Sequence, residues 1–360
     1  MILSISKISR MGRKRIGILL AVFFIFVGAG MAQAENKKDN PFGVLEFLHW
    51  NDSWNNYQYP DRGSLEKAVA LMKDAGVGMV RLDFIWQSIE YCPGTVDYAK
   101  YDHLVELLER NGIQILGILD YAADWDSPQK QWNFPNPDHS AFIRYACGVV
   151  RRYQGRIKYW EVWNEPDSSA YWNPQDGMKD YVRLLKEVYP ELKRSDPACL
   201  VLNGGLANGP ASVNRLYDNG AGGYFDIMNV HVFQTPLDPE ALTRAKAQIV
   251  LTRKIMERNG DADKKIWITE TGCPGVRKPE KPANWWLGKN PTEEQQAEWA
   301  KDILGGLLQE KSVEKIFWAF FRDTNAHWKN GTDYLGLVRS DFSRKPAFEA
   351  YKRAFRDWSE

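Results

Sequence analysis

Short β-branched and aromatic runs alternate with longer amphipathic segments from residue 41 to the end of the chain. Eight such runs are expected, each followed by a segment with helical periodicity. This alternation is typical of parallel β/α units, because a parallel strand needs a crossover helix to bring the chain back. The pattern therefore predicts an α/β fold, and a closed (β/α)8 TIM barrel in a single domain is its natural form.

The expected strands and helices follow one another without a break. The strands are predicted at 43–48, 78–84, 113–120, 157–164, 199–203, 225–232, 265–269 and 313–320. The helices are predicted at 64–75, 98–110, 137–153, 178–194, 213–218, 239–258, 293–309 and 346–358. An open doubly wound sheet would show the same alternation, but no glycine-rich phosphate loop follows the first strand. No linker rich in Pro, Ser or Gly divides the chain, so one domain is expected over 35–360.

The first 34 residues have the pattern of a secretory signal peptide. A basic stretch ending at Arg15 precedes an apolar run over 16–30, and Ala32-Gln-Ala34 has the small-x-small form of a cleavage site. Cleavage after Ala34 predicts a secreted or periplasmic protein without stable insertion in a membrane. The alternative is an uncleaved anchor, although the apolar run is short for a spanning helix.

Charge and aromatic content limit the partners. The chain has 47 basic and 46 acidic residues and no basic stripe, which argues against a nucleic-acid partner. Nine of its 15 tryptophans fall in loops that leave the carboxyl ends of expected strands, where a barrel carries its active site. Indoles around one mouth favour a carbohydrate-binding surface, and packing within large loops is the alternative. The nine are Trp50, Trp54, Trp86, Trp125, Trp132, Trp172, Trp285, Trp286 and Trp328.

Two segments end in a glutamate followed at once or closely by a chain-breaking residue. They are Trp160-Glu-Val-Trp-Asn-Glu-Pro166 and Ile266-Trp-Ile-Thr-Glu-Thr-Gly272. This arrangement presents Glu165 and Glu270 at the carboxyl ends of two different strands. Two carboxyl groups about 5 Å apart can serve as nucleophile and general acid, because the ionised group raises the pKa of the other.

Strand alternation predicts which side chains accompany the two glutamates. Glu161 and Trp163 are expected on the face of Glu165, and Ile266 and Ile268 on the face of Glu270. Glu161 lies roughly 13 Å below Glu165 along the strand. We therefore interpret Glu161 as a buried structural carboxylate paired with a base.

Several further residues are candidates for the site. Arg81, near the end of the second strand, can keep one glutamate ionised, and the alternative is a structural ion pair with Asp83 or Glu46. His231, His49 and Tyr121 stand at strand ends and are candidate substrate contacts, as is Asp120. A single histidine at a strand end is also a common core residue.

No metal or other cofactor is predicted, because no His, Asp or Glu cluster has metal-ligand spacing. The four cysteines, Cys92, Cys147, Cys199 and Cys273, are far apart, and their pairing does not follow from the sequence.

These residues resemble the clan A retaining glycoside hydrolases, and most of all glycoside hydrolase family 39. The most specific match is Trp163-Asn164-Glu165-Pro166 on a fourth strand with Thr269-Glu270 on a seventh. The resemblance implies that 35–360 is a catalytic domain with Glu165 as acid/base and Glu270 as nucleophile. The implied substrate-binding residues are Arg81, Asn164 (at the sugar 2-hydroxyl), His231, Trp318 (as floor of the bound sugar) and Trp86, the last paired with Glu90.

Other matches lie near the carboxyl terminus, over 335–339 and 345–347. The sequence departs from the family at Phe233, where many members have a tyrosine that hydrogen-bonds the nucleophile. A tyrosine from elsewhere, or Arg81 and His231, would have to replace it.

The resemblance implies a retaining β-glycosidase acting on an oligo- or polysaccharide. The long β-sandwich of the family's β-xylosidases is absent from this sequence, which favours barrel-only members that cut polysaccharides, including bacterial exopolysaccharides. The rim of aromatic residues favours endo-acting cleavage. The alternatives are an exo-acting β-xylosidase or β-glucosidase type of enzyme, a transglycosylase, and a non-catalytic carbohydrate-binding barrel.

Overall fold

The computed structural model describes residues 39–51, 59–174, 176–278, 289–324 and 327–360. Residues Asn40–Glu360 form one compact unit. The predicted signal peptide and three of the predicted rim tryptophans, Trp54, Trp285 and Trp286, lie outside the described residues.

Eight parallel strands form the central sheet, in the order β7-β6-β5-β2-β1-β10-β9-β8. The edge strands β7 and β8 meet through two parallel bridges, Leu202 with Ile227 and Leu206 with Val230, which close the barrel. The predicted (β/α)8 fold is therefore confirmed. The strands are β1 (Phe42–Leu45), β2 (Met79–Ile85), β5 (Gln114–Asp120), β6 (Tyr159–Asn164), β7 (Leu200–Gly205), β8 (Met228–His231), β9 (Ile266–Thr271) and β10 (Val313–Ala319).

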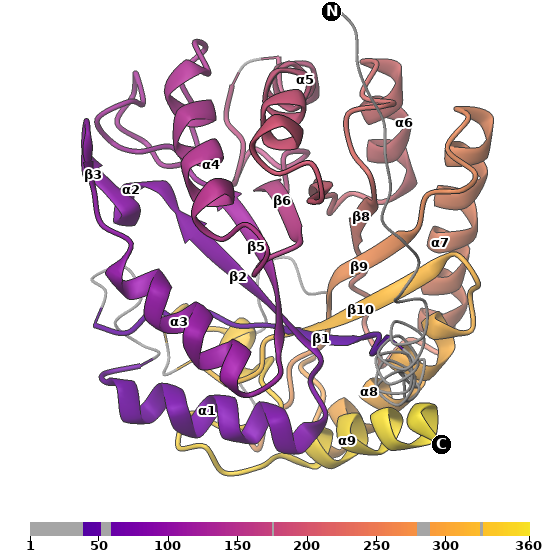
Figure 1. Ribbon diagram of the computed structural model, residues 1–360. Helices are drawn as coiled ribbons and strands as arrows, with labels where there is room; N and C mark the ends of the chain where they lie inside the picture. Colours follow the sequence, from indigo (N-terminus) through magenta and orange to yellow (C-terminus); the bar gives the residue numbers. More distant parts are fainter. Residues whose placement is uncertain (1–38, 52–58, 175, 279–288, 325–326) are drawn as a thin grey trace, which may run out of the picture. The chain divides into compact units, whose positions relative to one another are not determined.

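Helices surround these strands (Figure 1). A short helix α2 (Trp86–Ile89) and a hairpin of β3 (Glu90–Cys92) and β4 (Thr95–Val96) are inserted after β2. A 3-10 turn, η1 (Gly331–Tyr334), follows β10. The larger helices are α1 (Arg62–Ala75), α3 (Ala99–Arg110), α4 (Ser140–Arg152), α5 (Met178–Ser195), α6 (Pro210–Asp218), α7 (Ala241–Arg258), α8 (Glu293–Leu308) and α9 (Pro346–Ser359).

The ends of the helices follow local capping chemistry. Helix α1 begins two residues earlier than Ser64, because Asp61 is the residue that accepts a hydrogen bond from the backbone N–H of Ser64. The helix stops at Gly76, which has a φ of 84° that glycine tolerates. Helix α8 begins with a capping box between Thr292 and Gln295.

The core has two layers. Large side chains fill the base of the barrel, among them Met79, Leu116, Leu202, Trp267 and Phe317. A larger apolar layer lies between the strands and the helices. Because the barrel interior is packed below, the carboxyl-end mouth is where the strands can present polar side chains to a ligand.

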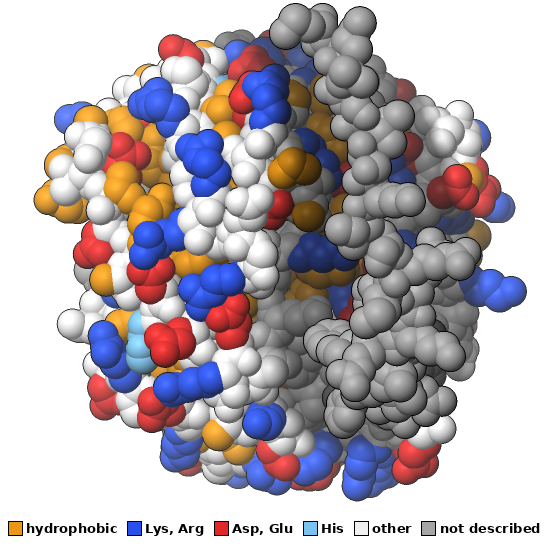
Figure 2. Space-filling model, in the orientation of Figure 1, with side chains coloured by type: hydrophobic (Ala, Val, Ile, Leu, Met, Phe, Trp, Pro, Cys, Tyr) orange, Lys and Arg blue, Asp and Glu red, His pale blue; other side chains and the backbone are white. Residues whose placement is uncertain are grey.

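The outer surface carries charges of both signs. Figure 2 shows Lys and Arg side chains interspersed with Asp and Glu side chains on one face. Among the described residues, no helix has the length and apolar character needed to cross a bilayer.

Candidate active site

Glu165 and Glu270 meet at the mouth of the barrel. With His231 they form a group in which one ligand atom of each residue lies within 4.8 Å of the others. The two carboxylates are 15% and 13% exposed, so both are recessed yet reachable from solvent. This arrangement agrees with the sequence analysis, which predicted Glu165 and Glu270 at the carboxyl ends of two different strands.

Glu165 reaches the mouth because the end of β6 leaves regular strand geometry. Trp163 has a φ of 67° and Glu165 a φ of 43°, both in the left-handed region that is costly for side chains larger than glycine. The Trp163 ring packs against Phe142 of α4 and Trp172, and its indole N–H donates to the carbonyl of Tyr171. The prediction that Trp163 shares the face of Glu165 is therefore wrong.

Glu270 reaches the mouth through an irregularity in β9. The register of β9 shifts against both neighbouring strands just before this residue. Ile266 and Ile268 pack in the layer beneath the helices, and Trp267 points into the barrel base. The prediction that the two isoleucines share a face with Glu270 is therefore wrong. An irregularity of this kind re-aims a side chain, which strict alternation cannot anticipate.

Arg81 joins the candidate residues into one network. Its Nη1 donates to Glu270 Oε1 at 2.7 Å, and its Nε and Nη2 donate to the two oxygens of Glu161 at 2.7 and 2.8 Å. Nη2 also donates to Asn164 Oδ1 at 2.8 Å. Arg81 is 1% exposed and Glu161 fully buried, so this bidentate pair is held rigidly.

The interpretation of Glu161 as a structural carboxylate agrees with this geometry. The alternative prediction for Arg81 was an ion pair with Asp83 or Glu46. Its ion pairs are instead with Glu161 and Glu270. Glu46 instead accepts hydrogen bonds from the backbone N–H groups of Phe321 and Arg322 and from the Tyr59 hydroxyl.

His231 connects the two glutamates. Its Nδ1 lies 2.8 Å from Glu165 Oε1, and its Nε2 lies 3.2 Å from Thr269 Oγ1 and 3.7 Å from Glu270 Oε1. The Thr269 hydroxyl donates to Asn229 Oδ1, which leaves its oxygen available to accept from the ring. Burial alone would lower the pKa of His231, but Glu270 and Glu165 outweigh that effect and raise it.

Burial and the neighbouring positive charges act in opposite directions on the pKa of Glu270. Burial raises the pKa of Glu270 above its ordinary value, while His231 and Arg81 oppose that effect and Glu165 adds to it. The guanidinium that contacts Glu270 directly favours its ionised form. Arg81 is thus the direct contact that favours the anion of Glu270 against the effect of burial.

Gly205 at the end of β7 was not predicted as a site residue. A Cβ on this glycine would lie 2.0 Å from His231 Nε2. Its N–H donates to Glu161, and its carbonyl accepts from the N–H of Glu165. The only sequence signal was the pair Gly204-Gly205 directly after the predicted strand 199–203; in the structure both belong to β7, where glycine is a sign of close approach.

The other predicted contacts are more deeply buried. His49 is fully buried, and its Nε2 lies 2.9 Å from the carbonyl oxygen of Asp83. Trp318 is fully buried and donates to the carbonyl of Leu335. Trp86 is 1% exposed, donates to Glu90 and stacks on Tyr145. The roles of His49, Trp318 and Trp86 in sugar binding stay predictions. Trp86 and Trp172 are buried, which agrees with the alternative that tryptophans of these loops serve in packing.

Asp83 and Asp120 form a second buried carboxyl pair beside Arg81. They are 4% and 0% exposed. Asp83 Oδ2 and both oxygens of Asp120 have no hydrogen-bond partner among the described residues. Burial, followed by the charge of Asp83, raises the pKa of Asp120 well above its ordinary value. Asp120 therefore holds its proton under conditions where a free aspartate has lost it.

We expect Asp120→Asn to make stability less dependent on pH. The amide has the same shape and can donate to Asp83. In the unfolded wild type Asp120 ionises above about pH 4, whereas the folded state keeps the proton. The wild-type free energy of unfolding therefore falls as pH rises from about 4 toward the raised pKa, and asparagine lacks this loss.

Urea unfolding of both proteins from pH 4 to 7 checks this prediction, with the exposed Asp218→Asn on α6 as control. The gain in stability of Asp120→Asn over wild type is expected to grow with pH. A constant difference across the range would contradict it.

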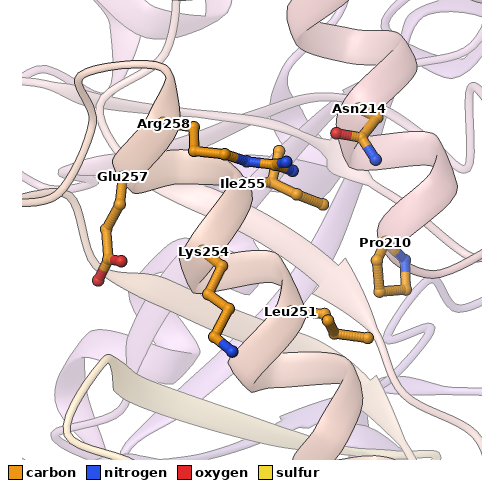
Figure 3. A pocket seen from close by; sticks show the side chains of 7 residues that line it. All are labelled: Pro210, Asn214, Leu251, Lys254, Ile255, Glu257 and Arg258. Atoms are coloured by element: carbon orange, nitrogen blue, oxygen red, sulfur yellow. The ribbon is translucent and has the colours of Figure 1, made fainter.

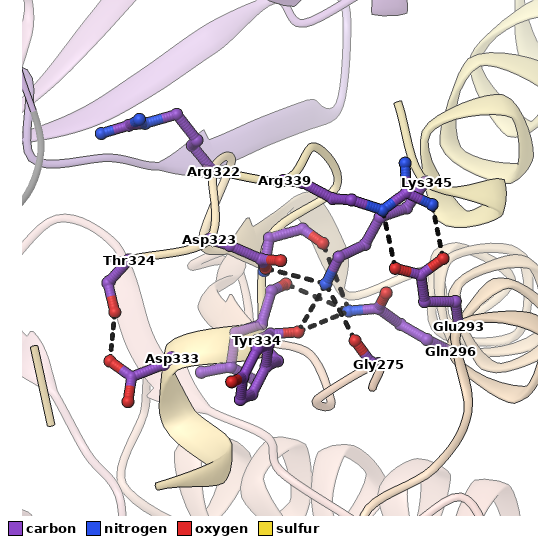
Figure 4. Close-up of polar contacts among 12 residues, drawn as sticks. Gly275, Glu293, Gln296, Arg322, Asp323, Thr324, Asp333, Tyr334, Arg339 and Lys345 are labelled. Carbon is purple, nitrogen blue, oxygen red and sulfur yellow. Dashed lines mark hydrogen bonds and ion pairs between the residues drawn. The ribbon is translucent and has the colours of Figure 1, made fainter. Parts of the chain in front are cut away.

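A polar cluster anchors the loop that follows Glu270 (Figure 4). Lys345 Nζ donates to Asp323 Oδ1 at 2.8 Å and to the carbonyls of Gly275 and Tyr334. Gln296 of α8 donates to the carbonyl of Cys273. These contacts tie the chain just after β9 to the segment after β10, and they give Lys345, in the family-like 345–347 segment, a structural role.

The structure also contains a pocket away from the mouth. It has a volume of about 660 Å³ and lies between α6 and α7 in the outer helical layer, lined by Pro210, Asn214, Leu251, Lys254, Ile255, Glu257 and Arg258 (Figure 3). None of these residues belongs to the network around Glu165 and Glu270, so the pocket is separate from the candidate chemistry.

Glu165, His231 and Glu270 are also of the types that bind divalent ions, and their spacing could hold one. All three nevertheless make polar contacts within the protein, to Arg81, Thr269 and one another. The prediction that the chemistry needs no metal stays a prediction.

Comparison with known proteins places the chain. It is 31% identical over 112 residues to endo-1,4-beta-xylanase 3 of Hypocrea jecorina, covering 29% of this chain and 31% of that protein. It is 21% identical over 300 residues to endo-1,4-beta-xylanase 5-like of Arabidopsis thaliana, covering 76% and 45%. The chain thus spans less than half the length of both curated relatives.

Solved structures share the fold. A family 39 glycoside hydrolase from the gut symbiont Bacteroides cellulosilyticus WH2 has a TM-score of 0.68 at 21% identity, covering 88% of this chain and 64% of that one. Native xylanase 10B from Thermotoga maritima has a TM-score of 0.61 at 16% identity, covering 90% and 97%. The sequence profile of the glycosyl hydrolase catalytic core matches residues 142–351. This protein belongs to the glycosyl hydrolase catalytic core family.

Proposed function

We propose that this protein is an exported hydrolase that cuts β-glycosidic bonds within a polysaccharide and retains the anomeric configuration. The observation that carries the proposal is the spacing of Glu165 and Glu270, whose nearest ligand atoms lie within 4.8 Å. Retaining glycosidases hold their carboxyl groups about 5–5.5 Å apart, whereas inverting enzymes leave about 6.5–9.5 Å for a water molecule. The short spacing supports a double displacement.

The contacts of each glutamate assign its role. Glu270, paired with Arg81, attacks the anomeric carbon as an anion and forms a covalent glycosyl intermediate. Glu165 gives its proton to the leaving oxygen and then removes a proton from the water that releases the sugar. His231, whose side chain is fully buried, contacts Glu165 at 2.8 Å and orients it. Asn164, held by Arg81, is placed for the sugar 2-hydroxyl.

Two parts of the proposal rest on other observations. Export rests on the signal-like sequence over 1–34. A polysaccharide substrate is supported by the xylanase-named relatives and by the aromatic side chains in the loops at the mouth. Exopolysaccharides of bacterial surfaces belong to the same substrate class.

The stereochemistry of the first product tests the mechanism. We expect new reducing ends from at least one β-linked polysaccharide in a panel of xylan, glucans, mannan and bacterial exopolysaccharides. Proton NMR of the first turnover should show the β-anomer before mutarotation, because two displacements restore the starting configuration. An α-anomer as first product would exclude the double displacement. Release of single sugars without internal cuts would indicate exo action, and product chains longer than the substrate would indicate transglycosylation.

A further inference from the structure

Three aromatic rings lie in the two loops that follow β5 and β6, and Glu165 is the first residue of the second loop. Tyr121 follows β5, Trp132 lies in the loop before α4, and Tyr171 lies in the loop before α5. Ring centroids of Tyr121 and Trp132 are 4.8 Å apart, those of Trp132 and Tyr171 are 5.9 Å apart, and those of Tyr121 and Tyr171 are 6.5 Å apart. We call this group the aromatic trio.

The trio presents one indole to solvent on a rigid base. Trp132 is 45% exposed, whereas the two tyrosines are partly buried. The backbone on both sides of Trp132 is held, since Gln131 N–H donates to Ser127 Oγ, the Trp132 carbonyl accepts from Ala122 N–H, and the Asn133 side chain donates to the carbonyl of Ala170 in the loop of Tyr171. Loop packing would bury the Trp132 ring, whereas here it is exposed and continuous with the rings of Tyr121 and Tyr171, and a contiguous exposed apolar face is typical of a binding surface.

The trio lies on the acid/base side of the catalytic pair. The carbonyl of Tyr171 accepts from the indole of Trp163, two residues before Glu165. Burial, followed by the charges of Glu165 and then Glu270, raises the pKa of Tyr171. Tyr171 lies in the same loop as Glu165, which begins it, and on the side of the mouth that β6 forms.

We infer that the trio forms the stacking platform for the leaving-group side of the substrate, with Trp132 as the contacting ring. The assignment rests on the proposed function: a group that protonates the leaving oxygen must stand beside the leaving group. An indole face matches the apolar C–H face of a pyranose with equatorial substituents. The favoured leaving group is thus a β-linked sugar chain that continues past the cleaved bond.

A second exposed indole provides a comparison. Trp328, after β10, is 36% exposed and stacks on Phe320 at 5.6 Å. Phe320 packs in a cluster with Ala319 of β10 and Leu45 of β1, with Phe233 beside it, so this ring belongs to a different part of the mouth. Loss of Trp328 should not distinguish substrates that differ only in their leaving group.

Paired substrates with the same glycone test the platform. One is a β-linked xylo-oligosaccharide and the other the para-nitrophenyl β-glycoside of a shorter xylo-oligosaccharide, with an analogous glucose-based pair. We expect Trp132→Ala to lower kcat/KM roughly 10-fold on the oligosaccharides through KM, and to change the aryl glycosides less than twofold. Trp132→Phe should restore most of the loss, and Trp328→Ala should affect both members of a pair equally.

Binding without hydrolysis can be measured for the other polysaccharides of the panel. In native gels containing each polysaccharide of the panel, wild type should be retarded by its substrate and Trp132→Ala retarded less. Equal effects of Trp132→Ala on both members of a pair, or unchanged retardation, would overturn the platform while leaving the glycosidase standing. Absence of both hydrolysis and retardation in the wild type on every polymer would overturn the proposed function and the platform together.

Discussion

Glu270→Gln is expected to abolish hydrolysis, with a fall in kcat of roughly 10⁴-fold or more. Glutamine has nearly the same shape as glutamate, and its amide oxygen can still accept the hydrogen bond from Arg81 Nη1. It cannot attack the anomeric carbon as an anion, so the covalent intermediate does not form. Because the change removes a charge and little else, the fold should survive.

Reducing-end release from the active polysaccharide measures this effect, with thermal unfolding as the test of folding. The matched control is Glu187→Gln, which changes a half-exposed glutamate on α5 that contacts His139 and lies outside the mouth. The control should retain wild-type activity. A folded Glu270→Gln protein that keeps more than about a tenth of the activity would remove Glu270 from the nucleophile role.

The pattern of the sequence predicted the barrel because hydrophobic periodicity reports directly on burial. The predicted start of each large helix and of each barrel strand lies within a few residues of its observed place; the largest differences are at α4, α6 and β8, which begin at Ser140, Pro210 and Met228 rather than at 137, 213 and 225. Parallel topology then brings the carboxyl ends of the strands to one edge, which is why Glu165, Glu270, Arg81 and His231 could be predicted to meet.

Local backbone irregularities set the limit of that prediction. The positive φ of Trp163 and the register shift before Glu270 change which side chains face the mouth. Both depend on tertiary contacts that outweigh the regular alternation of a strand. The burial of individual tryptophans could not be predicted from the sequence either. Trp86 and Trp132 both follow strand ends, yet Trp86 is 1% and Trp132 45% exposed.

Arg81→Met is expected to lower both stability and activity, because Arg81 is shared by two carboxylates. Glu161 is fully buried, and of the donors in the described part of the chain it would keep only the N–H of Gly205, on its Oε1. Removing one partner of a buried ion pair costs about 3–5 kcal/mol. Thermal and urea unfolding should show that loss.

Activity should respond through Glu270. Arg81 lowers the pKa of Glu270, so its removal should raise that pKa further above the ordinary value. The nucleophile must be ionised, and activity falls as pH drops through its pKa. The acid limb of the kcat/KM profile should therefore move to higher pH in Arg81→Met.

Combining Arg81→Met with Glu161→Gln separates the two effects. The glutamine keeps an acceptor for the N–H of Gly205 and removes the unpaired buried charge, so most of the lost stability should return. Glu270 still lacks its cation, so the shifted acid limb and the reduced activity should persist. Recovery of activity together with stability would show that Arg81 acts on the fold alone, and that Glu270 depends on other groups, such as His231, to stay ionised.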